Sequence, residues 1–192
     1  QGGMEYDGAC TAAPDALDFA LRHPERMAGL LLFGTSACGA WSPDWPWALK
    51  REAFDDWVAR LTEPALYDDS LRRFAPSAAG EPAVQAWYAR LLRNAASRRG
   101  AVASLRAYQA MDLRQRLAAL RTPTLVMQRR DDRIVPFAAG RWLAQAIAGA
   151  RFEALDGADH FLWHGDAGRV AASVEQFVGR RASAERSERI AA

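Results

Sequence analysis

Cysteine and histidine are scarce in this chain. Among its 192 residues there are two cysteines, Cys10 and Cys38, and three histidines. Two cysteines cannot build the dense disulfide framework of a small secreted domain, so we expect both to be free thiols. No motif implies a metal ion or an organic cofactor, and any chemistry must therefore come from side chains.

The chain also lacks an apolar run long enough to span a membrane. Its first ten residues, "QGGMEYDGAC", have neither the basic nor the apolar region of a signal peptide. These features predict a cytoplasmic protein without membrane association. The formal net charge is only +2, and the basic residues are dispersed except near the C-terminus, so we expect no nucleic-acid binding by this domain. Because the sequence begins with Gln1 rather than methionine, we expect it to be a piece of a longer protein.

Half of the residues are hydrophobic and a quarter are charged, a composition typical of a soluble globular domain. Short apolar runs bounded by glycine or proline alternate with helical periodicity. The pattern predicts strands at about 28–34, 122–128 and 150–155, and helices from about residue 13, at 138–148 and at 167–180. Strands that alternate with helices favour an α/β fold with a parallel sheet.

Two segments depart from this alternation. Residues 35–119 combine tryptophans and prolines with amphipathic helical stretches, which indicates an all-helical insert. Its tryptophans near position 45 are expected to serve core or lid packing; if they line a pocket, they favour an apolar substrate. Residues 181–192 carry many charges and a weak core pattern, and we interpret them as a charged linker.

The stretch around Cys10 has the features of a nucleophile at a sharp strand-to-helix turn. Such a turn requires small neighbours, and the neighbours here are Gly8, Ala9, Ala12 and Ala13. The N-terminus of the following helix would lower the pKa of a thiol and could bind an oxyanion. The alternative is a small buried thiol, which is the usual role of a free cysteine and the role we expect for Cys38.

A cysteine nucleophile needs a base and an orienting acid. His160 follows a predicted strand, where a doubly wound sheet carries its site residues. His164 is a weaker candidate, and His23 is expected to be a surface or capping residue. Asp131 and Asp132 follow the strand at 122–128 and are candidate acids, or turn residues before the next proline. The chain order nucleophile, acid, histidine is that of the α/β-hydrolases.

Three segments together resemble the second half of an α/β-hydrolase: "GACTAAPDALDFALRHPERMAGLLLFG", "TPTLVMQRRDDRIVPFAAGRWLAQAIAGARFEAL" and "GADHFLWHGD". The similarity is closest to the hydrolase domains joined to adenylate/guanylate cyclases or helix-turn-helix regulators. It implies Cys10 as nucleophile, Asp132 in D-x-x-V-P as acid, with Asp131 as alternative, and His160 as base. The N–H of Thr11 would be one oxyanion-hole donor, and the loop that supplies the second donor in the family has no counterpart in this sequence.

The resemblance also implies a domain division. Residues 1–34 would form the elbow, helix and following strand of the core, 35–119 a helical cap, 120–180 the C-terminal core with the acid and histidine loops, and 181–192 the linker. The earlier strands of the family are missing from the sequence. We therefore expect an exposed apolar sheet edge and marginal stability for this piece alone.

The implied function is hydrolysis of a small apolar ester or amide through a Cys-His-Asp triad. The family's G-x-S-x-G reads G-A-C-T-A here, and this departure keeps an alternative open. The chain could be a non-catalytic, ligand-sensing domain that regulates a cyclase or DNA-binding module fused downstream. A non-functional gene fragment is the third interpretation.

Overall fold

The computed structural model describes residues 7–9, 13–60, 70–95 and 97–191. In this part of the chain, parallel strands form one sheet in the order β1-β2-β3-β4. The strands are β1 (Asp7–Ala9), β2 (Leu30–Phe33), β3 (Thr124–Arg129) and β4 (Arg151–Leu155). The predicted α/β class and parallel sheet are therefore confirmed, and the three strands expected from apolar runs correspond to β2, β3 and β4.

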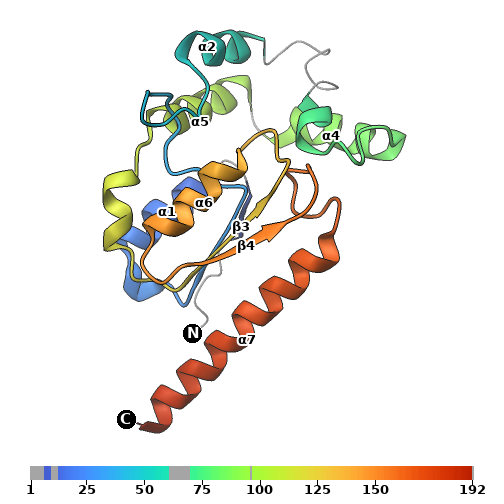
Figure 1. Cartoon of the computed structure of the whole chain (residues 1–192). Coiled ribbons are helices and arrows are strands. Elements are labelled where there is room, and N and C mark those ends of the chain that lie inside the picture. Colours follow the sequence, from blue (N-terminus) through green and yellow to red (C-terminus); the bar gives the residue numbers. More distant parts are fainter. Residues whose placement is uncertain (1–6, 10–12, 61–69, 96, 192) are drawn as a thin grey trace.

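Helices cover both faces of this sheet because its strands are apolar on both faces, as parallel strands require. Helices α1 (Ala13–Arg22) and α6 (Phe137–Ala146) pack with Leu30, Leu32 and Val126 into one buried cluster, and α6 lies in front of the strands in Figure 1. On the opposite face, α7 (Ala167–Ala191) packs Val170 and Phe177 against Phe33, Leu125 and Met127. Successive side chains along a strand thus enter different halves of the core.

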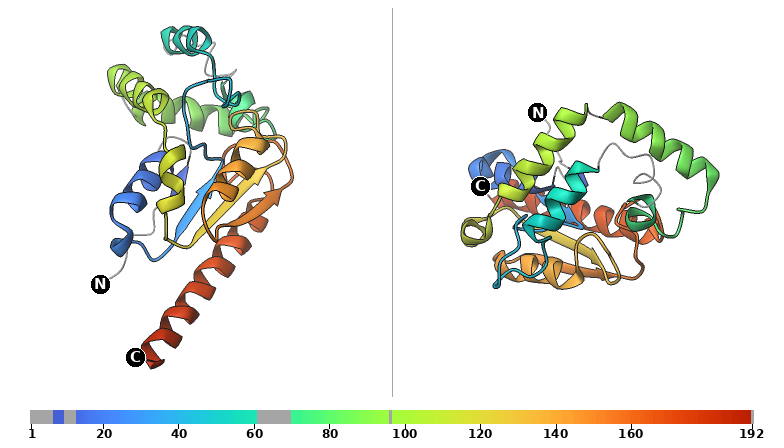
Figure 2. Two further views of the ribbon diagram at one scale, coloured as in Figure 1. Left: turned by 60° about the vertical axis from the view of Figure 1, so that its left-hand side comes forward. Right: turned by 90° about the horizontal axis from the view of Figure 1, so that it is seen from above.

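The insert expected between residues 35 and 119 contains the helices α2 (Arg51–Ala59), α4 (Pro82–Ala95) and α5 (Arg98–Ala110), and residues 70–74 are also helical. A short 3₁₀ helix, η2 (Arg114–Ala119), leads from this insert back to β3. Figures 1 and 2 show α2, α4 and α5 beyond the end of the sheet toward which the strand arrows point. The insert therefore stands over the carboxyl ends of the strands.

The entry and exit segments of the insert are paired with each other. The N–H of Gly39 donates to the carbonyl of Met111 at 3.0 Å, and the N–H of Leu113 donates to Ala37 at 2.9 Å. We call these two segments, residues 37–39 and 111–114, the cap base. A β-carbon on Gly39 would overlap the backbone carbonyl of Tyr108, so only glycine fits where α5 comes closest to the cap base.

The last helix differs from the expectation. A helix was predicted over residues 167–180, followed by a charged linker, whereas α7 runs for 25 residues to Ala191. Figure 1 shows its C-terminal part extending past the sheet. The linker role and the domain division remain predictions. No helix in the described part of the chain combines the length and apolar character needed to cross a bilayer.

Candidate active site

Two of the predicted site residues meet at the carboxyl end of the sheet. Asp132 follows β3 and His160 follows β4. The Nδ1 of His160 lies 2.8 Å from the Oδ2 of Asp132, and the two side chains are 1% and 0% exposed, respectively. A short, buried carboxylate–imidazole contact fixes the orientation of the ring and stabilises its protonated form.

The carboxylate of Asp132 is held from several directions. Its Oδ1 accepts the backbone N–H groups of Ile134 at 2.8 Å and Val135 at 3.1 Å. Its Oδ2 accepts the Nε2 of Gln128 at 3.0 Å, and the same amide donates to the carbonyl of Val135 at 2.9 Å. Because each oxygen of a buried carboxylate needs donors, these contacts account for the burial of Asp132 and keep it aimed at His160.

His160 is positioned by both the cap and the core. Its backbone N–H donates to the carbonyl of Phe74 at 2.7 Å, and the Phe74 ring packs edge-on against the imidazole, with 5.4 Å between ring centroids. Gly34, which directly follows β2, also lies next to the imidazole and has a φ of +56°. A β-carbon at Gly34 would lie 2.8 Å from the Cε1 of His160, so the imidazole occupies space that only glycine leaves open.

The other candidate residues lie elsewhere. Asp131 is exposed, although its backbone N–H donates to Gly157. His23 stands at the N-cap position of the short 3₁₀ helix η1 (Pro24–Arg26) without a side-chain capping hydrogen bond, and it packs against the Phe19 ring, with 4.9 Å between centroids. His164 is half-buried in the loop that carries His160. Cys10 and Thr11 lie outside the described residues, so their assignments remain predictions.

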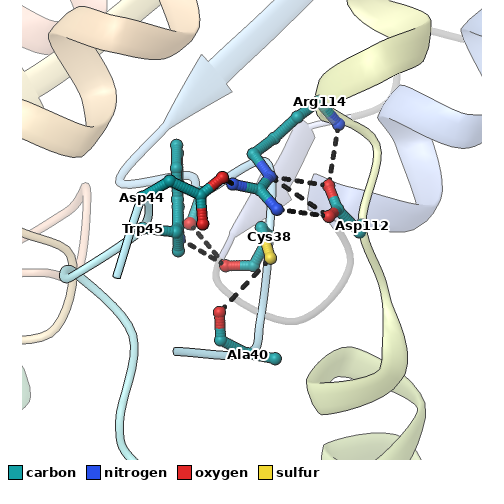
Figure 3. Close-up of polar contacts among 7 residues, drawn as sticks. Cys38, Ala40, Asp44, Trp45, Asp112 and Arg114 are labelled. Atoms are coloured by element: carbon teal, nitrogen blue, oxygen red, sulfur yellow. Dashed lines mark hydrogen bonds and ion pairs between the residues drawn. The ribbon is translucent and has the colours of Figure 1, made fainter. Parts of the chain in front are cut away.

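Cys38 lies in the cap base, and burial raises the pKa of its thiol. The thiol donates to the carbonyl of Ala40 at 3.4 Å, and the Cys38 carbonyl accepts the Nε1 of Trp45 at 3.1 Å. Beside it, Arg114 forms ion pairs with Asp112 and Asp44 (Figure 3). A buried, protonated thiol is a poor nucleophile, in agreement with the structural role expected for Cys38.

Three residues of this site, Gln128, Gly34 and Arg129, were not predicted from the sequence. Gln128 and Gly34 end the apolar runs at 122–128 and 28–34, and Arg129 directly follows the first of these runs. The signal available for Gln128 was a polar side chain at the end of a buried run, four positions before Asp132. No group of three or more His, Cys, Asp or Glu side chains among the described residues is placed to hold a metal ion.

A parallel sheet with a helical insert and a buried Asp–His pair at its carboxyl end defines the α/β-hydrolase class. The chain belongs to this family, because the family model described as "alpha/beta hydrolase fold" matches residues 14–166. The predicted family is thus confirmed, and the fusion to a cyclase or regulator remains a prediction.

Known relatives include esterases. The chain is 33% identical over 165 residues to a pimeloyl-[acyl-carrier protein] methyl ester esterase of Aromatoleum aromaticum, covering 78% of this chain and 64% of that protein. The structure of this chain resembles an esterase of Exiguobacterium antarcticum, with a TM-score of 0.82 and 23% identity, covering 90% of this chain and 65% of that protein. An enol-lactonase of Burkholderia xenovorans gives a TM-score of 0.76, 26% identity and coverage of 90% and 64%. The chain spans about three fifths of the length of the curated relatives it matches.

Proposed function

We propose that this chain is the catalytic part of an acyl hydrolase that cleaves small apolar esters through Cys10, His160 and Asp132. The observation that carries the proposal is the buried contact of 2.8 Å between His160 and Asp132. Such a pair supplies an oriented general base, which is the component that a thiol or hydroxyl nucleophile requires.

The ends of neighbouring elements support the assignment of Cys10 as the nucleophile. β1 ends at Ala9, which pairs with Phe33, the last residue of β2. Gly34 follows Phe33 and lies beside the His160 ring. Helix α1 begins at Ala13. In the chain, residues 10–12 therefore follow a strand that ends at the edge of the sheet where His160 lies, and they precede the N-terminus of a helix. A helix N-terminus favours a thiolate and an oxyanion. The N–H of Thr11 is the proposed oxyanion donor.

In the proposed reaction, His160 accepts the thiol proton of Cys10 and the thiolate attacks the ester carbonyl. Asp132 stabilises the imidazolium, which then donates its proton to the departing alkoxide as the carbon–oxygen bond breaks. The product is a thioester on Cys10. Water, deprotonated by His160, attacks this thioester and releases the acid and the regenerated thiol.

The ester substrate is proposed from the relatives and from the cap. The methyl ester esterase and the enol-lactonase are named for carboxylic ester substrates. In this chain the Phe74 ring packs on His160, and Phe161 stacks on Phe74 with 5.4 Å between their centroids. Aromatic walls next to the base favour an apolar acyl or alcohol group.

The test is hydrolysis of p-nitrophenyl acetate and of short-chain methyl esters by the wild-type chain and variants, with any flanking sequence that its gene encodes. We expect Cys10→Ala to abolish turnover and Asp132→Asn to lower kcat by about 1,000-fold or more, because the ring loses its orienting carboxylate. Asp131→Asn is the matched control and should stay within about twofold of wild type. Equal activity of Cys10→Ala and wild type would refute the triad.

The departure G-A-C-T-A from the family's serine motif favours a second candidate, a ligand-sensing domain without turnover. Cys10→Ser separates the two functions. Esterase activity that is retained or raised in the serine variant supports the hydrolase. Binding of a short-chain methyl ester, measured by calorimetry, without hydrolysis in either variant supports the sensor.

A further inference from the structure

Arg129 is a buried cation that takes no part in the proposed reaction. It is the last residue of β3, and its side chain is 1% exposed. Burial lowers the pKa of its guanidinium, yet arginine remains charged in proteins. A buried charge is costly unless other groups compensate it, so the surroundings of Arg129 indicate why it is there.

The compensating groups belong mainly to the loop that carries His160. The Nη1 of Arg129 donates to the carbonyls of Asp159 at 2.6 Å and Phe161 at 3.1 Å, and its Nη2 donates to the carbonyl of His164. The Asp159 carboxylate lies 4.0 Å away. On the sheet side, the guanidinium lies over the Phe33 ring, 5.3 Å from its centroid. Arg129 therefore binds the residues immediately before and after His160.

We propose that Arg129 is a positioning residue, which holds the 159–164 loop so that the His160 imidazole stays on Asp132; this rests on the proposed function. The cap fixes the backbone N–H of His160 through Phe74, and Arg129, at the end of β3, fixes the flanking carbonyls. The guanidinium fork can reach several carbonyls at once, whereas a lysine ammonium offers one compact charge.

The close packing of the 159–164 loop around the Arg129 guanidinium supports this assignment. Gly165 has a φ of +66°, and a β-carbon there would lie 2.7 Å from the Asp159 Oδ2 and 3.5 Å from the Arg129 Cζ. On the cap side, the N–H of Ser77 donates to the Asp159 Oδ1 at 2.9 Å. The loop is therefore closed around the guanidinium, and loss of its donors would leave buried carbonyls unsatisfied and free the loop to shift.

The experiment compares Arg129→Lys and Arg129→Met with the control Arg130→Met in the chain used for the ester assay. Arg130 adjoins Arg129, but its side chain is 56% exposed and lies 3.3 Å from the exposed Asp156. We expect both Arg129 variants to lower kcat by about 10- to 100-fold with KM changed less than about twofold, because the base is misplaced while the aromatic residues beside it, Phe74 and Phe161, are unchanged. Arg130→Met should keep the wild-type values.

A second readout does not depend on turnover. In protein labelled with ¹⁵N-histidine, the Nδ1–H signal of His160, assigned with His160→Gln, reports its bond to Asp132. We expect the signal to shift or vanish in both Arg129 variants and to persist in Arg130→Met. If the wild type lacks esterase activity, the proposed function fails, but this signal still decides the role of Arg129.

Thermal unfolding followed by circular dichroism identifies variants that do not fold. If Arg129→Met is unfolded, Arg129→Lys decides the question. A folded Arg129→Lys with wild-type kcat and an unchanged His160 signal would overturn the proposal. It would also be overturned if neither Arg129 variant folds while Arg130→Met does, because the arginine would then serve the whole fold rather than the histidine loop.

Discussion

At the scale of single residues, adjacent residues of the same type around the end of β3 differ in burial. Asp131 is exposed, whereas Asp132 is buried and accepts bonds from Gln128, His160 and the following backbone. Arg129 and Arg130 differ in the same way, one enclosed by the histidine loop and the other exposed. After β3, Arg130 and Asp131 are exposed, whereas Arg129 and Asp132 are buried at the site, so each pair contains its own control.

Gly34 offers a prediction at this scale. Alanine there would adopt a φ of +56° and place its β-carbon 2.8 Å from the His160 ring. Gly149→Ala is the matched control, because its φ is +74° and nothing lies within 4 Å of the added carbon. Both variants should lose about 1–2 kcal/mol of stability from the left-handed backbone.

Only Gly34→Ala should also lose ester hydrolysis, by about 10-fold or more, because the imidazole must move away from its bonding position. Chemical denaturation and steady-state kinetics measure the two effects separately. Equal activity in the two alanine variants would contradict this prediction, because the His160 ring would then tolerate a β-carbon at residue 34.

At the scale of elements, the sequence pattern predicts much of the fold. The apolar runs ending at Gly34 and near Gln128 form β2 and β3, and the proline-led pattern after Cys10 becomes α1. These elements have strong local signals: continuous hydrophobicity for buried strands and periodicity for helices. The continuation of α7 to Ala191 was missed because its last residues are charged and lack a core-facing stripe.

The site could be predicted only in part. Asp132 and His160 follow strand ends, and parallel strands bring their carboxyl ends together. Gln128, Gly34 and Arg129 act through contacts that no local pattern encodes: Arg129 binds carbonyls 30, 32 and 35 positions away. Such roles depend on how elements pack, and the local sign of Gln128 and Arg129 is a polar side chain at the end of a buried strand.

The cap base yields a prediction about pH. The hydrogen bond from Arg114 lowers the pKa of Asp112 below its ordinary value of 3.8. A carboxyl with a lowered pKa in the folded state stabilises the protein above its ordinary pKa, and this contribution is lost as pH falls through the lowered value. Arg114→Met should therefore reduce the free energy of unfolding at pH 7, and this reduction should become smaller as pH falls below 3.8, the ordinary pKa of the carboxyl.

The expected loss at pH 7 is about 1 kcal/mol or less, because the Asp112 side chain is 42% exposed and solvent screens the pair. Urea unfolding of wild type and Arg114→Met at pH 7 and pH 3 measures it. Arg60→Met, which removes an exposed ion pair with Asp56 of 3.0 Å, should change stability by no more than a few tenths of a kcal/mol. A destabilisation by Arg114→Met that is equal at both pH values would exclude the ion pair as its cause.

At the scale of the whole molecule, stability should be distributed unevenly across the sheet. β3 lies between β2 and β4, and each of its six residues is buried. It contributes to both halves of the core, through Val126 on the α6 face and through Leu125 and Met127 on the α7 face. In the part of the chain that the structure describes, β1 has three residues and pairs with β2 alone.

Hydrogen exchange of the chain therefore has a predicted order. Amides of β3 should exchange only through global unfolding, whereas amides of β1 should exchange through local opening, because a short strand with one paired neighbour separates without disrupting the core. Mass spectrometry of peptides covering residues 7–9 and 124–129 measures both rates in one sample. Denaturant well below the unfolding midpoint should accelerate exchange in β3 and leave that in β1 nearly unchanged. If β1 were as strongly protected as β3, with the same denaturant dependence, its far edge would have to be covered by another segment of the protein.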